Sequence, residues 1–161
     1  MCLVKMVSDP YYNESSIFNL VHYALTDKST GTHVRYYGGY NVDVSRAAEQ
    51  IVLVKQYFHK WNGRKMRQFI VSFDESIAPY DAYILGWQIA AYYADRFQII
   101  FGVHEDTENV HIHFVFNTVS FIDGLKYSGS YADLCSLKAH AKQIYENMVY
   151  SKQLGPRQNP L

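Results

Sequence analysis

One predicted hairpin constrains the fold of this chain more than any other feature. Two runs rich in branched and aromatic residues, FQIIFGV at 97–103 and HIHFVFN at 111–117, are separated by a short polar segment. Such runs are typical of two antiparallel strands joined by a turn. Side chains of a strand alternate between its two faces, so His111 and His113 share one face. The other face carries three apolar residues: Ile112, Phe114 and Phe116.

The same hairpin brings a third histidine to the first two. His104 follows the first run, and the turn returns it to the neighbourhood of His111. His111 and His113 are expected to lie about 6–7 Å apart along their strand. Three imidazoles on one face of a sheet predict a metal site with open coordination positions. The alternative is a polar sheet face on which histidine happens to recur.

The ligand type limits the choice of ion. Three neutral imidazoles suit Mn²⁺ or Zn²⁺, and Mg²⁺ is also compatible because phosphate oxygens and waters complete its coordination shell. Asp106 lies in the turn between the histidines. We expect Asp106 either to hold an imidazole in the right tautomer or to act as the base for an incoming hydroxyl. The alternative is an aspartate that only forms the turn.

The rest of the chain alternates between predicted strands and helices. Further strands are expected over residues 3–7, 33–40 and 68–73. Four helices are expected to begin at Ser15 or Ser16, Ser45, Pro79 and Ser130, and to end near Thr26, His59, Asp95 and Met148. Together with the antiparallel hairpin, this order predicts an α/β or α+β sandwich.

Length and composition limit the class of protein. With 161 residues the chain is expected to form one domain, 1–161, whose last residues, LGPRQNPL, fray. Cys2 and Cys135 lie too far apart for a metal or redox motif, which predicts a reduced, cytoplasmic protein. No apolar run approaches the ~20 residues of a membrane span, so we expect no membrane insertion. The formal net charge of zero argues against a large non-specific nucleic-acid binder.

A basic segment stands out against this neutral background. Residues 55–67, KQYFHKWNGRKMR, contain five cations and no acidic residue. The cations are interleaved with aromatic residues, a pattern suited to the phosphates and bases of single-stranded nucleic acid. The residues expected to bind DNA are Lys60, Trp61, Arg64, Lys65 and Arg67. The alternative is a helix end whose solvated basic residues complement the helix dipole.

The histidine motif resembles that of a known family. The sequence HEDTENVHIH at 104–113 matches the His-x-Asp-x4-His-x-His motif of the relaxase/mobilisation nuclease family, in the HUH endonuclease superfamily. It is most similar to the relaxases with one catalytic tyrosine, often called MOBP. LVHYALTDK at 20–28 resembles the helix that bears this tyrosine, here Tyr23. FIVSF at 69–73 resembles the strand whose serine, here Ser72, helps to hold DNA near the scissile phosphate.

The resemblance implies a fold and an activity. The implied fold is α+β: a central, mainly antiparallel sheet of about five strands, with the His-x-His strand in the middle and helices on both sides. The implied activity is metal-dependent nicking of single-stranded DNA at the transfer origin of a plasmid or integrative element. Tyr23 would form a 5′-phosphotyrosyl intermediate and release a 3′-hydroxyl. An accessory DNA-binding protein and a conjugative coupling protein are the expected partners.

Several alternatives remain open at this stage. Tyr11, Tyr12 and His22 are rival nucleophiles because they lie close to Tyr23 in sequence. In a rolling-circle replication initiator or a single-strand transposase the tyrosine follows the histidine pair, which would favour Tyr145 or Tyr150. A non-catalytic DNA-binding accessory module and a metal-dependent hydrolase that uses bound water are further interpretations.

Overall fold

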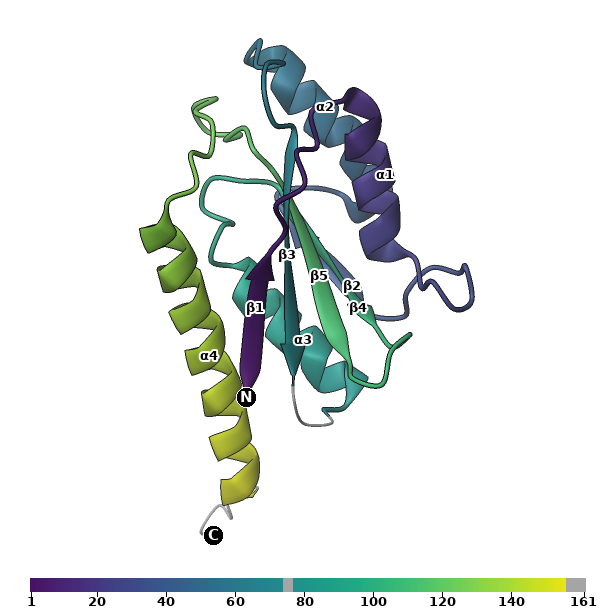
Figure 1. The fold of residues 1–161 in the computed structure, drawn as a ribbon, viewed down its shortest axis with the longest axis vertical. Helices are drawn as coiled ribbons and strands as arrows, with labels where there is room; N and C mark the ends of the chain where they lie inside the picture. The colour runs from purple at the N-terminus through teal and green to yellow at the C-terminus, as the bar shows by residue number, and fades with distance from the viewer. Residues whose placement is uncertain (74–76, 156–161) are drawn as a thin grey trace, which may run out of the picture.

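The structure is a computed structural model that describes residues 1–73 and 77–155, and a five-stranded sheet forms its centre (Figure 1). The strands are β1 Cys2–Met6, β2 Tyr37–Tyr40, β3 Met66–Phe73, β4 Ile99–His104 and β5 His111–Asn117. Their order is β1-β3-β5-β4-β2, and each neighbouring pair is antiparallel. The predicted α+β class is confirmed, and the His-x-His strand β5 occupies the middle of the sheet.

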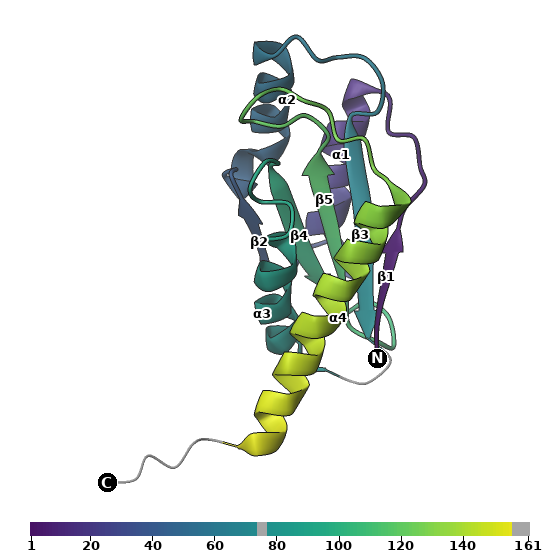
Figure 2. The same cartoon turned by 90° about the vertical axis from the view of Figure 1, so that its left-hand side faces the viewer.

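Helices cover both faces of the sheet. On one face lie α1 Glu14–Leu25 and α2 Ala47–Tyr57, the second preceded by the 3₁₀ helix η1 Val44–Arg46. On the other face lie α3 Pro79–Ala90 and α4 Tyr131–Leu154. Figure 2 shows α4 crossing in front of the sheet, with α1 behind it. None of the helices in the described parts of the chain is long and apolar enough to cross a membrane.

The apolar face of β5 packs under α3 and α4 and fixes the register of the strand. Ile112, Phe114 and Phe116 are fully buried, and the Phe114 ring stacks on Phe69 of β3 with centroids 4.5 Å apart. Burying a side chain of this size contributes about 1.5–3 kcal/mol. A slip by one residue would bring these rings to the opposite face. The packing of the apolar face therefore also determines where the histidines of β5 point.

On the histidine face, α1 lies close to β4 because Gly102 has no side chain. A Cβ atom at Gly102 would lie 2.0 Å from the carbonyl oxygen of Ala24 in α1. Gly102 pairs with His113 in the sheet. The last turn of α1 is therefore held directly over the histidines.

Several predicted helix and strand ends are wrong, and local hydrogen bonds explain why. The helix predicted from Ser45 starts with a 3₁₀ turn, because the Asp43 carboxylate accepts from the Ser45 amide at 3.0 Å. Helix α1 begins at Glu14, with Asn13 as its N-cap residue in place of Ser15 or Ser16. The cap predicted at Ser130 is confirmed: its hydroxyl accepts from the amide of Asp133.

Other elements differ from the prediction in length. Of the strand expected over 33–40 only Tyr37–Tyr40 forms, because His33 instead closes the loop after α1 through a bridge to Thr26. Helix α3 ends at Ala90 because the following residues make tighter bonds of the i to i−3 type. Helix α4 continues to Leu154, and 156–161 of the tail predicted to fray lie outside the described residues.

Candidate active site

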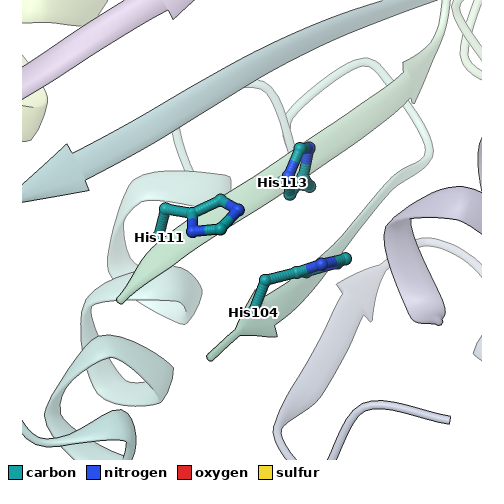
Figure 3. Close-up of side chains that lie close together, drawn as sticks. All are labelled: His104, His111 and His113. Carbon is teal, nitrogen blue, oxygen red and sulfur yellow. The ribbon is translucent and has the colours of Figure 1, made fainter. Parts of the chain in front are cut away.

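Three histidines converge at the turn end of the β4–β5 hairpin. His104 and His111 are paired across the two strands, and His113 lies two residues further along β5. Figure 3 shows their rings turned toward a common space. One possible ligand nitrogen from each ring lies within 4.8 Å of the other two, so the three histidines could hold one ion. This arrangement is the one that alternation along the strands predicts.

Hydrogen bonds define which ring nitrogen of two histidines is available. Nε2 of His104 lies 2.9 Å from the carbonyl oxygen of Ala24, so it must carry the proton and donate. Nδ1 of His104 is then an unprotonated acceptor, and it is buried without a hydrogen-bond partner among the described residues. Nδ1 of His111 lies 3.2 Å from the carbonyl oxygen of Asn109, which leaves its Nε2 as the acceptor.

Burial lowers the pKa of two of the imidazoles and so favours their neutral form, which is the form that binds metal. Burial lowers the pKa of His113 to about 3, with the neighbouring His104 and His111 acting in the same direction. Burial also lowers the pKa of His104. Protons therefore compete weakly with an ion for these two nitrogens at neutral pH.

Asp106 faces the lone pairs of the histidines rather than their N–H groups. Its carboxylate oxygens lie 3.9 Å from Nδ1 of His104 and 3.7 Å from Nε2 of His111, and its side chain is 6% exposed. Asp106 Oδ1 is also buried without a hydrogen-bond partner in the described part of the chain. Acceptors that face each other in a buried space are costly when unpaired, and a cation between them removes that cost. The donor set and these two unpaired atoms therefore fit a divalent ion.

Tyr23 of α1 is the tyrosine that meets this cluster. Its ring centroid lies 5.0 Å from that of His113 and 6.3 Å from that of His104. The neighbouring His22 is exposed and lies beside Thr26, because successive helix residues point about 100° apart. The last turns of α1 thus place Tyr23, rather than His22, next to the histidines.

Of the rival tyrosines, Tyr11 lines a hollow together with Tyr23, and the others lie on the surface or in the core. Tyr12 is exposed, and Tyr11 donates to Gln68 of β3. Tyr145 packs on Phe73 in the core between the sheet and α4, on the face opposite the histidines. Tyr150 is exposed on the same helix, α4. This placement disfavours the interpretations that depend on a C-terminal tyrosine.

Lys28 is a site residue that the sequence did not single out. Its ammonium lies 4.5 Å from the Tyr23 ring centroid. A hydrogen bond to the Tyr23 side chain and the nearby Asp106 raise the pKa of Lys28. Lys28 also lines a hollow of about 430 Å³ together with Tyr23, Asp106, His111 and His113. It lies in the loop after α1, where no local pattern distinguishes it from other exposed lysines.

Ser72 lies on the correct face, next to the histidines. It is in β3, in register with His111 of β5, so the two side chains point to the same side of the sheet. It is half-buried. A contact between its hydroxyl and DNA stays a prediction.

Three cations of the basic segment are not exposed on the face of the sheet that carries the histidines. Lys55 is fully buried, and its Nζ donates to the carbonyl of Lys65 and to Asn117, at 2.7 Å each. Lys65 is also buried, and its Nζ donates to carbonyls of its own loop. Arg67 lies on the opposite face of β3, against the Tyr127 ring. The sequence shows how many basic residues the segment contains, but not which of their side chains face solvent.

The other members of the segment lie nearer the surface. Lys60 is exposed, and Trp61 is half-buried against the core under α1 and α2. Arg64 donates from Nε to the carbonyl of Pro10 at 3.1 Å and from Nη2 to that of Ser8 at 3.3 Å. Binding of DNA by the basic segment stays a prediction.

Comparisons with known proteins agree with this geometry. The family model "Relaxase: MobA/VirD2-like, nuclease domain" matches residues 23–149. A solved structure described as "Molecular Basis of Vancomycin Resistance Transfer in Staphylococcus aureus" superposes with a TM-score of 0.67. The match covers 94% of each chain at 12% sequence identity, so it concerns the fold alone. No curated protein matches the sequence.

Proposed function

The chain belongs to the MobA/VirD2-like nuclease-domain family of relaxases, which bind single-stranded DNA at a transfer origin, and we propose that it nicks such DNA with Tyr23 as nucleophile. The observation that carries this proposal is the position of the Tyr23 ring beside His104 and His113, in a cluster of three histidines of which His104 and His111 face the Asp106 carboxylate. We propose that residues 1–161 form a single DNA-nicking domain.

We assign the histidines to a divalent ion. His104 through Nδ1, His111 through Nε2, and His113 would hold Mn²⁺, Mg²⁺ or Zn²⁺, with Asp106 beside it. When bound, such an ion neutralises charge that develops on the oxygens of the scissile phosphate. The rate of the reaction with each of the three ions would show which one the protein uses.

Residues of the chain supply the remaining steps. The Tyr23 hydroxyl attacks the phosphorus, its bond to phosphorus forms as the bond to the 3′-oxygen breaks, and the 3′-oxygen leaves with a proton. Asp106 lines the same hollow as Tyr23 and is the proposed acceptor of the phenolic proton. Lys28 balances negative charge on the phenolic oxygen as it attacks. One phosphodiester replaces another, so the step is reversible and permits religation.

A second hollow flanks Tyr23 on the side away from Asp106. It has a volume of about 560 Å³ and is lined by polar and apolar side chains, among them Lys5, Asn19, Leu20 and Ile70. We propose that a nucleotide next to the scissile phosphate lies there, because a base needs both an apolar floor and polar edges.

The test uses single-stranded oligonucleotides tiled over the transfer origin of the source element. The protein and Tyr23→Phe are incubated with these oligonucleotides and Mn²⁺ and separated on a denaturing protein gel. We expect a metal-dependent, SDS-resistant protein–DNA band that Tyr23→Phe lacks, because only the phenolic oxygen can form the adduct. Tyr12→Phe is the matched control and should keep the band, because Tyr12 is exposed and does not line the hollow beside the histidines.

Other outcomes would redirect the proposal. A band that persists in Tyr23→Phe would move the nucleophile to another residue. Cleavage without any adduct would indicate a hydrolase that uses water. Metal binding without cleavage would indicate a missing accessory partner or a non-catalytic DNA-binding module.

A further inference from the structure

The third histidine is held differently from the other two. His104 and His111 donate their ring N–H to backbone carbonyls of Ala24 and Asn109, which can only accept. Nδ1 of His113 instead lies 2.9 Å from the amide nitrogen, Nε2, of the buried Gln68. An amide has a donating end and an accepting end of nearly the same shape, so it can fix either tautomer of the ring.

The end of the amide that faces His113 decides whether this histidine can bind an ion. If the Gln68 nitrogen donates to Nδ1, the neutral ring carries its proton on Nε2 and has no free lone pair there. If Gln68 Oε1 accepts from Nδ1–H, the lone pair of Nε2 is free. A half-turn of the amide exchanges the two arrangements without moving the imidazole.

Tyr11 and Asp9 act on the far end of the same amide. The Tyr11 hydroxyl donates to Gln68 Oε1 at 2.8 Å and also lies 3.4 Å from Oδ2 of Asp9. If the hydroxyl donates to Asp9 instead, its oxygen becomes the acceptor for the Gln68 amide nitrogen, and Oε1 turns to His113. Burial and the Asp9 carboxylate raise the pKa of Tyr11 to about 12, so the hydroxyl keeps its proton and stays a donor.

The backbone holds Tyr11 in this position. Its φ of 44° lies in the left-handed region, which costs a non-glycine residue about 1 kcal/mol or more. The Tyr11 carbonyl accepts from the amide of Lys65 at 2.8 Å. Arg64 clamps the preceding carbonyls of Ser8 and Pro10. Part of the basic segment therefore fixes the loop that carries Asp9 and Tyr11.

In the structure the Gln68 amide nitrogen faces Nδ1 of His113 and Oε1 faces Tyr11. We propose that Gln68 is a positioning residue for His113, and that its amide turns when an ion binds: the Tyr11 hydroxyl then donates to Asp9, Oε1 of Gln68 accepts the Nδ1 proton, and Nε2 of His113 is left for the ion. This chain of side chains links a solvent-exposed carboxylate to a buried ligand. The proposal rests on the metal role assigned to the histidines above.

Mn²⁺ affinity, measured by calorimetry on the whole protein, tests this coupling without any DNA. Gln68→Met should bind Mn²⁺ about 10- to 100-fold more weakly, the usual effect of losing a partner of a ligand. Gln68→Glu, whose carboxylate can only accept, should restore binding. Gln98→Met is the matched control: Gln98 is equally buried and loses one hydrogen bond, from Asn117, away from the histidines.

A double-mutant comparison tests the relay, which is the chain of hydrogen bonds from Asp9 through Tyr11 and Gln68 to His113. It needs no substitution of the buried Gln68. Asp9→Ala should weaken Mn²⁺ binding several-fold in the native protein and have no effect in a Tyr11→Phe background. A direct electrostatic effect of Asp9 on the ion would persist in both backgrounds and would overturn the relay. Equal losses in Gln68→Met and Gln98→Met would also overturn it.

The tautomer can be observed directly. Long-range ¹H–¹⁵N correlation spectra of the Zn²⁺-loaded protein should show His113 with its proton on Nδ1, and a proton on Nε2 would contradict the proposal. If the native protein binds neither Mn²⁺ nor Zn²⁺, the metal role and the coupling both fail. If it binds both ions but the variants behave alike, the coupling alone fails.

Discussion

Lys28 offers the sharpest test at the scale of single residues, because its ammonium lies beside the ring of Tyr23. We expect Lys28→Met to slow formation of the DNA adduct by about 10- to 1000-fold, because a cation that faces developing negative charge stabilises the transition state. Mn²⁺ affinity should change little, since Lys28 is not a ligand. The adduct rate is measured in single-turnover gel assays at saturating Mn²⁺.

Two further variants separate charge from structure in this test. Lys28→Arg keeps the cation and should recover much of the rate. Lys142→Met removes a lysine that pairs with Glu146 on the exposed side of α4, and it should behave as the native protein. An unchanged rate in Lys28→Met would remove Lys28 from the proposed chemistry.

The site residues differ in how far the sequence could predict them. His104, His111 and His113 were predictable because alternation along a strand is a local rule. Lys28 and Gln68 were not, because the loop after α1 and strand β3 meet the histidines only in the folded chain. Asp106 was predicted as a residue of the site, but sequence cannot tell whether its carboxylate faces a ring N–H or a lone pair.

Gly102 carries the prediction at the scale of elements, because it sets the distance between α1 and β4. In Gly102→Ala the new Cβ would overlap the Ala24 carbonyl, so α1 must move away from the sheet. The Ala24 carbonyl accepts from His104, and Tyr23 precedes it by one residue. We therefore expect both weaker Mn²⁺ binding and a slower adduct reaction, together with a lower Tm.

A second glycine separates the loss of the site from a general loss of stability. Gly31 has a φ of 67°, and a Cβ atom added to it would meet no atom within 4 Å in the described part of the chain. Gly31→Ala should cost about 1 kcal/mol of stability through backbone strain. It should leave Mn²⁺ affinity unchanged. Equal affinities of the Gly102 and Gly31 variants would contradict the role given to the contact between α1 and β4.

The elements themselves were predicted with uneven success, for physical reasons. β5 was predicted to the residue because its alternation is strict and the turn before it is short. The start of η1 and the end of α3 were missed because they depend on the Asp43 cap and on tight turns before Tyr93, whose ring enters the core. Interactions of that kind are decided by tertiary packing rather than by local pattern.

At the scale of the whole molecule, the buried ammonium of Lys55 joins α2 to Lys65, the residue before β3, and to Asn117, the last residue of β5. Burial, with Lys126 and Lys65 nearby, lowers the pKa of Lys55 to about 7, from an ordinary value of 10.5. Between pH 7 and pH 10.5 the unfolded chain therefore binds more protons at Lys55 than the folded chain does. The free energy of unfolding should rise with pH across this window, by up to about 1.4 kcal/mol per pH unit.

Lys55→Met removes this dependence because methionine does not titrate. Urea unfolding of the native protein and the variant at pH 7, 8 and 9 gives the difference in unfolding free energy, in which the other groups cancel. We expect the difference to grow with pH in favour of the native protein.

Tyr11 titrates only near pH 12 in the folded chain, outside the measured range. Lys60→Met, an exposed lysine near the end of α2, should follow the native profile. Parallel profiles of the native protein and Lys55→Met would show that the three hydrogen-bond acceptors around Lys55 keep its ammonium charged in the core.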